Sequence, residues 1–211
     1  RVSGLKNISP DQPKLFISNH AGGMGPLMIY ISLPVRLHPW VIAEMVDISR
    51  TPDYLFEDFI KPAWHLDGQI GKRISRLIAP IAVRVLRSLD PVSVDRNRGW
   101  CREAFQKSLE LLVSGESLLI FPEQPAKQCD PVSQIRPFLG GFCWLSQMYY
   151  KSTGKALAIQ PMAVFPPGRR MIIASPEYLN LHGNYRKAID RSVVHLEATV
   201  KRKYQEISSL C

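Results

Sequence analysis

Residues 14–27 read KLFISNHAGGMGPL, and this stretch decides the fold. An apolar run, residues 14–18, leads into a glycine-rich turn, and a second apolar segment follows at residues 27–31. The pattern is typical of a strand, a tight turn and a helix. The turn places His20 beside a helix N-terminus, where the helix dipole favours a neutral imidazole that can accept a proton. His20 is therefore a candidate general base, although a turn histidine without a chemical role also fits this stretch taken alone.

Composition indicates one globular domain over residues 1–211. Hydrophobic residues make up 45% of the chain and charged residues 21%, which excludes a disordered protein. The 27 Lys and Arg against 18 Asp and Glu give a net charge of +9. Such an excess favours an anionic partner, either a phosphate-bearing ligand, a membrane surface or nucleic acid. Solubility alone is the other explanation of the charge.

The cysteines and the apolar runs exclude two further classes. Cys101, Cys129, Cys143 and Cys211 contain no C-x-x-C pair, so we expect no structural zinc site, and nothing in them requires an oxidising compartment. We expect reduced thiols in a protein on the cytoplasmic side. No apolar run is long enough to cross a bilayer, and no signal peptide opens the sequence.

Strand and helix patterns alternate along the chain. They predict strands near 14–18, 40–43, 91–96, 117–121, 157–165 and 170–174, and helices near 99–113, 138–150 and 185–207. The first helix should end by Pro34, and residues 47–71, with Pro52 and Pro62, should be irregular. We therefore expect an α/β fold, a single domain with a mostly parallel mixed sheet flanked by helices.

Residues 72–89 form a basic amphipathic segment that Pro80 should kink or divide. It has no acidic residue, and its basic residues lie among a possible apolar stripe of Ile74, Leu77, Ile78, Ile81, Val85 and Leu86. One interpretation is a helix lying on an anionic membrane surface. The other is a surface helix whose stripe is buried in the core.

Three predicted strand ends carry polar groups, namely His20, Arg96 and Glu123. Ligands of α/β proteins gather at the carboxyl ends of strands. There, a histidine could deprotonate a hydroxyl, an arginine could hold a phosphate, and a carboxylate could orient a donor or a polyol. This set of residues favours a transferase site.

Four short blocks resemble those of the glycerolipid acyltransferases, the lysophosphatidic acid acyltransferase or PlsC-like group. They are Ser18-Asn19-His20, Val94-Asp95-Arg96, Phe121-Pro122-Glu123 and Ile159-Gln160-Pro161-Met162-Ala163, within a resemblance that runs from about residue 2 to residue 175. The segment Phe138-Leu139-Gly140-Gly141-Phe142 also resembles one in that family. The resemblance implies a glycerol-phosphate acyltransferase-like fold.

The resemblance also implies an activity, the transfer of a fatty acyl group from an acyl-CoA or acyl-carrier-protein thioester to a hydroxyl of a lysolipid. By it, His20 is the catalytic base, Arg96 the phosphate ligand and Glu123 a binding-site carboxylate. Asn19 and Lys127 are counted with the substrate-binding residues. Apart from the thioester, we expect neither a cofactor nor a metal, and we expect a peripheral membrane surface but no nucleic acid as partner.

Two departures from the family pattern concern the same site. The family's first block is His-x4-Asp, and its aspartate falls on Gly25 here. The third block usually continues with Gly-Thr-Arg, whereas this chain has Gln124-Pro125-Ala126, with Lys127 close by. An aspartate that orients a catalytic histidine is worth about four orders of magnitude in rate in the protease triad. A non-catalytic relative that binds lipid or acyl thioester is therefore the alternative function.

Two other functions are weaker. A nucleotide site at residues 22–25 would use a helix N-terminus, but the glycine spacing fits neither the dinucleotide nor the Walker fingerprint. Nucleic-acid binding has only the net charge in its favour, since the basic residues are scattered. For an acyltransferase we expect an apolar groove beside His20, floored by Trp40, Phe142 or Trp144.

Overall fold

The computed structural model describes residues 1–95, 101–180 and 185–210. The chain divides into two compact units, residues 1–37 with 108–211, and residues 38–107. Parallel strand pairs, one antiparallel pair and flanking helices confirm the predicted α/β class with a mostly parallel mixed sheet. The assignment of residues 1–211 to a single acyltransferase-like domain stays a prediction.

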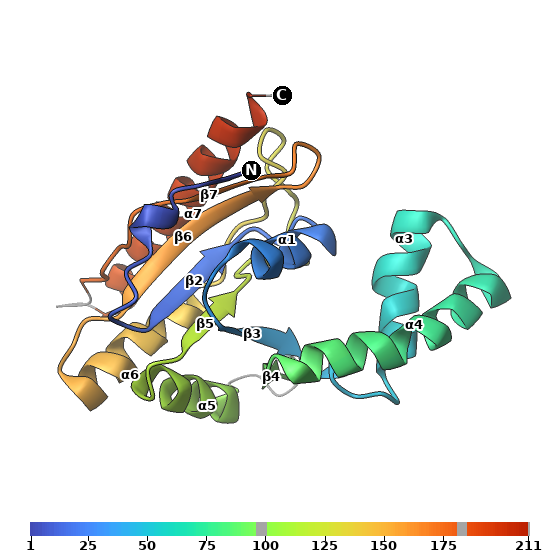
Figure 1. The fold of residues 1–211 in the computed structure, drawn as a ribbon, viewed down its shortest axis with the longest axis horizontal. Coiled ribbons are helices and arrows are strands. Elements are labelled where there is room, and N and C mark those ends of the chain that lie inside the picture. Colours follow the sequence, from blue (N-terminus) through green and yellow to red (C-terminus); the bar gives the residue numbers. More distant parts are fainter. Residues whose placement is uncertain (96–100, 181–184, 211) are drawn as a thin grey trace. The chain divides into compact units, whose positions relative to one another are not determined.

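The first unit is built on strands in the order β1-β7-β6-β2-β5 (Figure 1). Their bounds are β1 (Val2–Ser3), β2 (Lys14–Ser18), β5 (Ser117–Ile120), β6 (Ala158–Phe165) and β7 (Arg170–Ile173). The central strand β2 runs parallel to both β5 and β6, and every one of its residues is buried. Such a strand is covered on both faces, which explains its continuous apolar run.

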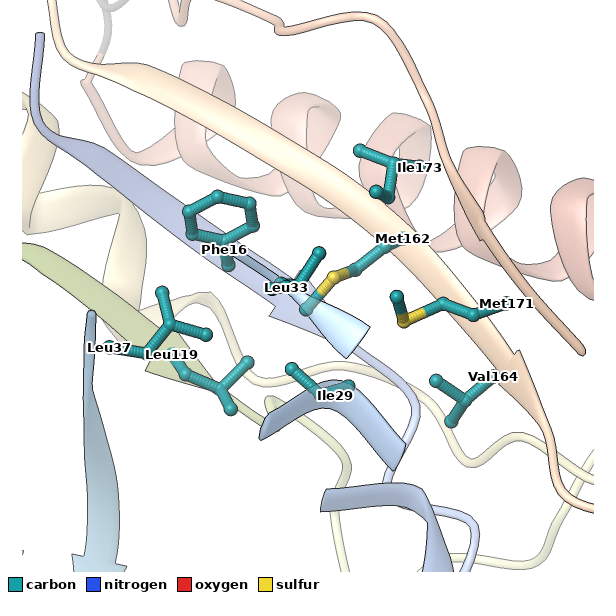
Figure 2. Close-up of a cluster of buried hydrophobic side chains, with 9 residues drawn as sticks. All are labelled: Phe16, Ile29, Leu33, Leu37, Leu119, Met162, Val164, Met171 and Ile173. Carbon is teal, nitrogen blue, oxygen red and sulfur yellow. The ribbon is translucent and has the colours of Figure 1, made fainter. Parts of the chain in front are cut away.

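Helices cover the two faces of this sheet. They are α1 (Met24–Ser32), α6 (Cys143–Thr153) and α7 (Tyr185–Ser208), with the short 3-10 helices η1 (Leu5–Asn7) and η5 (Gly140–Phe142). On one face, Ile29 of α1 and Leu33, the residue that follows the helix, pack with Phe16 in a buried cluster (Figure 2). Its other members come from the sheet strands and from the start of β3, namely Leu37, Leu119, Met162, Val164, Met171 and Ile173. On the other face, Tyr204 of α7 meets Phe165 edge-on at 5.5 Å.

The second unit joins a parallel strand pair to a set of helices. The strands are β3 (Leu37–Ile42) and β4 (Val92–Val94). The first residue of β3, Leu37, is assigned to the first unit. The helices are η2 (Ala43–Met45), α2 (Thr51–Leu55), the π-helical η3 (Phe56–Ile60), α3 (Lys61–Trp64) and α4 (Gly68–Ser88). Helix α5 (Arg102–Val113) runs from this unit into the first.

The prediction that residues 47–71 are irregular is wrong, because α2, η3 and α3 follow one another through this segment. Pro52 and Pro62 lie in the first two positions of α2 and α3. Pro52 lies in the first turn of this helical run, where the backbone N–H that proline lacks has no partner inside the helix. Pro62 lies where α3 continues η3 with helical backbone, so it does not interrupt the run. Pro80 likewise leaves α4 undivided from Gly68 to Ser88.

Candidate active site

His20 follows β2 directly and lies in the turn before α1. Ala21 and Gly22 have φ values of 46° and 64°, so both lie in the left-handed region. This sharp turn lets α1 start four residues after the histidine. The imidazole is half-buried, and its ring meets Phe121 edge-on, with 4.8 Å between the ring centroids. Phe121 follows β5 and so contributes to the orientation of the His20 ring.

Glu123 meets His20 because β2 and β5 are parallel neighbours whose carboxyl ends share one edge of the sheet. Its Oε1 accepts a hydrogen bond from the backbone N–H of His20 at 2.7 Å. Its Oε2 accepts one from the backbone N–H of Arg136 at 2.8 Å. Both carboxylate oxygens therefore bind backbone, which indicates that Glu123 positions the His20 turn. Its role as a substrate-binding carboxylate stays a prediction.

The loop after Glu123 returns to it and pairs with it. Glu123 and Phe138 form an antiparallel bridge, and the Gln124 N–H donates to Pro137 O at 2.9 Å. Lys127, at the exposed end of this loop, accepts a bond on its backbone oxygen from Arg136 Nε at 3.1 Å. The structure thus brings two basic side chains, Lys127 and Arg136, into the loop that Glu123 fixes.

Arg136 is a candidate that sequence reasoning missed. It lies 13 residues from Glu123 and belongs to none of the four blocks. The one signal in the sequence is its position two residues before the segment that starts at Phe138.

Asn19 is buried, and both polar atoms of its side-chain amide form hydrogen bonds with the backbone of β6. Its Nδ2 donates to Val164 O at 3.0 Å, and its Oδ1 accepts from Val164 N at 2.9 Å. These bonds indicate that Asn19 fixes the end of β2 against β6. A substrate-binding role for Asn19 stays a prediction.

Gly25, on which the resemblance places the family's aspartate, has no room for a side chain. A Cβ on Gly25 would lie 2.1 Å from the carbonyl oxygen of His20, and Val164 Cγ2 would lie at 3.2 Å. No real Cβ atom comes that close to a backbone oxygen, so this backbone requires glycine. Gly25 therefore allows the start of α1 to pack closely on the turn that carries His20.

The remaining predicted residues fall into two groups. Arg96 lies outside the described residues, just after the end of β4 at Val94. Of the proposed groove residues, Phe142 is buried, Trp144 packs on Tyr185 with 4.5 Å between centroids, and Trp40 packs edge-on against Phe105. The groove itself stays a prediction.

Two observations bear on other chemistry at this site. Burial raises the pKa of the Cys143 thiol to about 12, so Cys143 stays protonated at neutral pH and is a poor nucleophile. Across residues 1–95, 101–180 and 185–210, no three His, Cys, Asp or Glu side chains gather in a way that could hold a metal ion. In the same residues no helix has the length and apolar character needed to cross a membrane.

The sequence matches no protein-family model, and a search of curated proteins gave no match. A comparison of folds gave a clear result. The chain is similar to the 1-acyl-sn-glycerophosphate (LPA) acyltransferase PlsC from Thermotoga maritima, with a TM-score of 0.54 and 17% sequence identity. The similarity covers 97% of this chain and 70% of the other. At that identity it shows the fold alone, and the fold is that of a PlsC-like acyltransferase.

Proposed function

We propose that this protein is an O-acyltransferase that moves a fatty acyl group from an acyl-CoA or acyl-carrier-protein thioester to a hydroxyl of a lysolipid or related acceptor. The observation that carries the proposal is the bond between the His20 N–H and Glu123 Oε1. This backbone bond brings together two residues of the blocks that resemble the family, His20 and Glu123, at the carboxyl edge of a PlsC-like sheet. The protein would act at the cytoplasmic surface of a membrane, where its lipid acceptor is found.

His20 would serve as general base in one transfer step. An imidazole nitrogen takes the proton of the acceptor hydroxyl while the oxygen attacks the thioester carbonyl carbon. The new C–O bond forms, the C–S bond breaks, and the thiolate leaves with the proton held by the imidazolium. The imidazolium then donates this proton to the thiolate, so the products are an ester and a free thiol, and His20 is again neutral. Because residue 25 has no side chain, the Phe121 ring and the Glu123-bound backbone orient His20 in this proposal.

The acceptor's anionic group would meet the basic side chains of this edge. Lys127 and Arg136 lie in the Glu123 loop, and they could replace the Thr and Arg of the family's third block, which this chain lacks at Pro125 and Ala126. An arginine can bind two phosphate oxygens at once, and a lysine acts as a point charge. The resemblance also implies that Arg96 binds the phosphate. A phosphate-bearing lysolipid is therefore the first acceptor to test.

The test is thiol release and ester formation with purified protein, acyl-CoA and a panel of lysolipids with and without a phosphate monoester. We expect turnover that His20→Ala reduces by at least about a hundredfold, the lower range for general-base catalysis. His195→Ala is the matched control, because His195 is an exposed histidine on α7 that pairs with Glu177 at 2.9 Å. Equal turnover by the wild type and His20→Ala would remove His20 from the mechanism.

The second candidate function is a non-catalytic protein of this fold that binds lipid or acyl thioester. The glycine at position 25 is the observation that favours it. It predicts saturable binding of acyl-CoA, measured by calorimetry, with no thiol released over hours. Turnover that depends on His20 would exclude it.

A further inference from the structure

Helix α4 packs through small residues. Its buried positions are Gly71, Ser75, Ala79 and Val83, which recur every four residues and so lie on one face. A Cβ on Gly71 would lie 2.6 Å from Phe56 Cε2, which shows how closely the helix approaches η3. This face contacts η3 and α2. The large apolar side chains of α4 lie on other faces of the helix.

Those large side chains are exposed. Ile70, Leu77, Ile81 and Val85 are 64, 75, 67 and 55% exposed, and their spacing places them on a second face of the helix. We call these four residues the apolar face of α4. Leu77, Ile81 and Val85 belong to the stripe of residues 72–89, and its other members, Ile74, Ile78 and Leu86, are half-buried. The stripe as a whole is therefore not buried in a core. An apolar patch of this kind on a protein surface marks an interaction site.

A third face of α4 is basic. The helix carries Lys72, Arg73, Arg76, Arg84 and Arg87 and no acidic residue. Arg87 donates to Val46 O at 2.7 Å, and Lys72 lies 5.7 Å from the centre of the Phe56 ring. The other three, Arg73, Arg76 and Arg84, are exposed and form no ion pair with any residue that the structure describes. We call them the free arginines of α4.

We propose that α4 docks on the surface of an anionic phospholipid bilayer, with its apolar face among the acyl chains and its free arginines at the headgroups. Charge decides between a bilayer and a second copy of this chain. Two α4 helices packed face to face would bring arginines against arginines, with no carboxylate on either helix to pair them. An anionic bilayer supplies the opposite charge along the whole helix.

The test is flotation of the full chain with vesicles of phosphatidylcholine alone or with about one third phosphatidylglycerol. Binding requires no thioester and no turnover, so its outcome is independent of the proposed acyl transfer. We expect binding to the anionic vesicles and little binding to the neutral ones. Each basic residue near such a surface contributes about fivefold in partition, so Arg73→Gln/Arg76→Gln/Arg84→Gln should lower binding roughly a hundredfold.

The apolar face is tested with Leu77→Gln/Ile81→Gln, which should lower binding at least about tenfold with the net charge unchanged. Matched controls alter side chains of the same kind on other helices. Val113→Gln/Val194→Gln changes exposed valines on α5 and α7, and Arg191→Gln/Arg202→Gln removes exposed charges from α7. Both controls should bind vesicles like the wild type, and circular dichroism checks that every variant is folded.

Three results would overturn the proposal. The first is equal binding to neutral and anionic vesicles, or no binding to either. The second is a control variant that loses as much binding as the α4 variants. The third is a wild-type dimer in analytical ultracentrifugation that Leu77→Gln/Ile81→Gln converts to a monomer while vesicle binding is unchanged, which would make a second copy the occupant of the apolar face.

Discussion

Gly25 lies against the carbonyl group of His20, so that a Cβ on Gly25 would come within 2.1 Å of the His20 oxygen. The contact is between backbone atoms, and a side chain at position 25 cannot avoid it by choosing another rotamer. The start of α1 can therefore lie this close to the histidine turn only because residue 25 has no side chain.

Replacing Gly25 by alanine should destabilise the protein. The added methyl group must push back the His20 carbonyl, and overpacking of this kind costs about 1–3 kcal/mol of unfolding free energy. Gly23→Ala is the control, because Gly23 has a helical φ of −69° and open space around its Cβ position. Urea unfolding should place the midpoint of Gly25→Ala below the wild type and that of Gly23→Ala at or above it. Equal midpoints would show that the turn adapts.

The same contact predicts the result of introducing an aspartate at position 25, where the resemblance places one. Gly25→Asp should not increase acyl transfer, because the aspartate displaces the His20 backbone that it is meant to support. Thiol release by Gly25→Asp should be at or below that of the wild type, and similar to that of Gly25→Ala. A large gain in activity over the wild type would contradict this prediction and would mean that the turn relaxes to accept a dyad.

Glu123→Gln tests the positioning of the His20 turn. A glutamine has one carbonyl oxygen, so its NH₂ group must face one of the two backbone N–H donors, from His20 or from Arg136. A hydrogen bond to a charged group is worth about 1.5–3 kcal/mol, and we expect a loss of stability in that range. The NMR signals of the His20 imidazole should shift, and kcat should fall more than KM rises.

Glu177→Gln is the control for that experiment. Like Glu123, Glu177 has a partly exposed carboxylate that contacts other residues, here Thr199 and His195. It lies at the other end of the sheet, because its backbone pairs with Ile159, which is beside Leu15 near the amino end of β2. Its replacement should leave the His20 signals in place. If both variants shift them equally, Glu123 has no special role in the turn.

The sequence was sufficient to predict that His20 and Glu123 lie near each other. Two short apolar runs, each followed by a polar residue, predict parallel strands whose ends meet, and β2 and β5 are neighbours in parallel register. That the carboxylate binds the histidine's backbone rather than its ring was not predictable, because it depends on the angle of the turn. Arg136 was missed for a similar reason, since only the return of the loop onto Glu123 brings it near.

The helices of residues 47–71 were missed because proline was interpreted as a breaker. Its effect depends on position. Pro52 lies in the first turn of α2, and Pro62 lies where α3 continues η3, and the sequence does not show that either proline is accommodated in a helix. On α4 the period of the apolar residues was correct, but the buried face proved to be the one with glycine, serine and alanine. Hydrophobicity alone therefore could not decide whether the apolar stripe is buried, because close helix packing selects small residues.

Asn19→Asp should destabilise the joint between β2 and β6. The aspartate keeps an acceptor for Val164 N, but it loses the donor to Val164 O and places a negative charge against that carbonyl. Because the site is buried, we expect a loss of about 1–3 kcal/mol. Asn7→Asp is the control, since Asn7 makes one partly exposed bond of the same type to Ile173 O at 2.8 Å. Its loss, measured by urea unfolding, should be smaller.

Stability in acid should depend on Asp130, in the loop that carries Arg136. Asp130 Oδ1 accepts hydrogen bonds from Ser133 N at 2.7 Å, from Ser133 Oγ at 2.9 Å and from Val132 N at 3.1 Å. These bonds hold the pKa of Asp130 below its ordinary value of 3.8, and the bond from the Ser133 N–H has the largest effect. The charged form of Asp130 is thus favoured in the folded state. Its contribution to the free energy of unfolding is present above the ordinary pKa and is lost as the pH falls through the pKa of the folded state.

The measurement is the free energy of unfolding of wild type, Asp130→Asn and Ser133→Ala between about pH 5 and pH 2. The asparagine keeps the acceptor oxygen but does not titrate, so its stability should fall less steeply with acid than that of the wild type. Ser133→Ala keeps the backbone donor and loses the hydroxyl, which should give an intermediate slope. Parallel curves for all three proteins would contradict the prediction. Because Gln134 N donates to Asp130 O and Asp130 N to Ile135 O, acid that loosens this turn should also weaken the hold of the Arg136 backbone on Glu123.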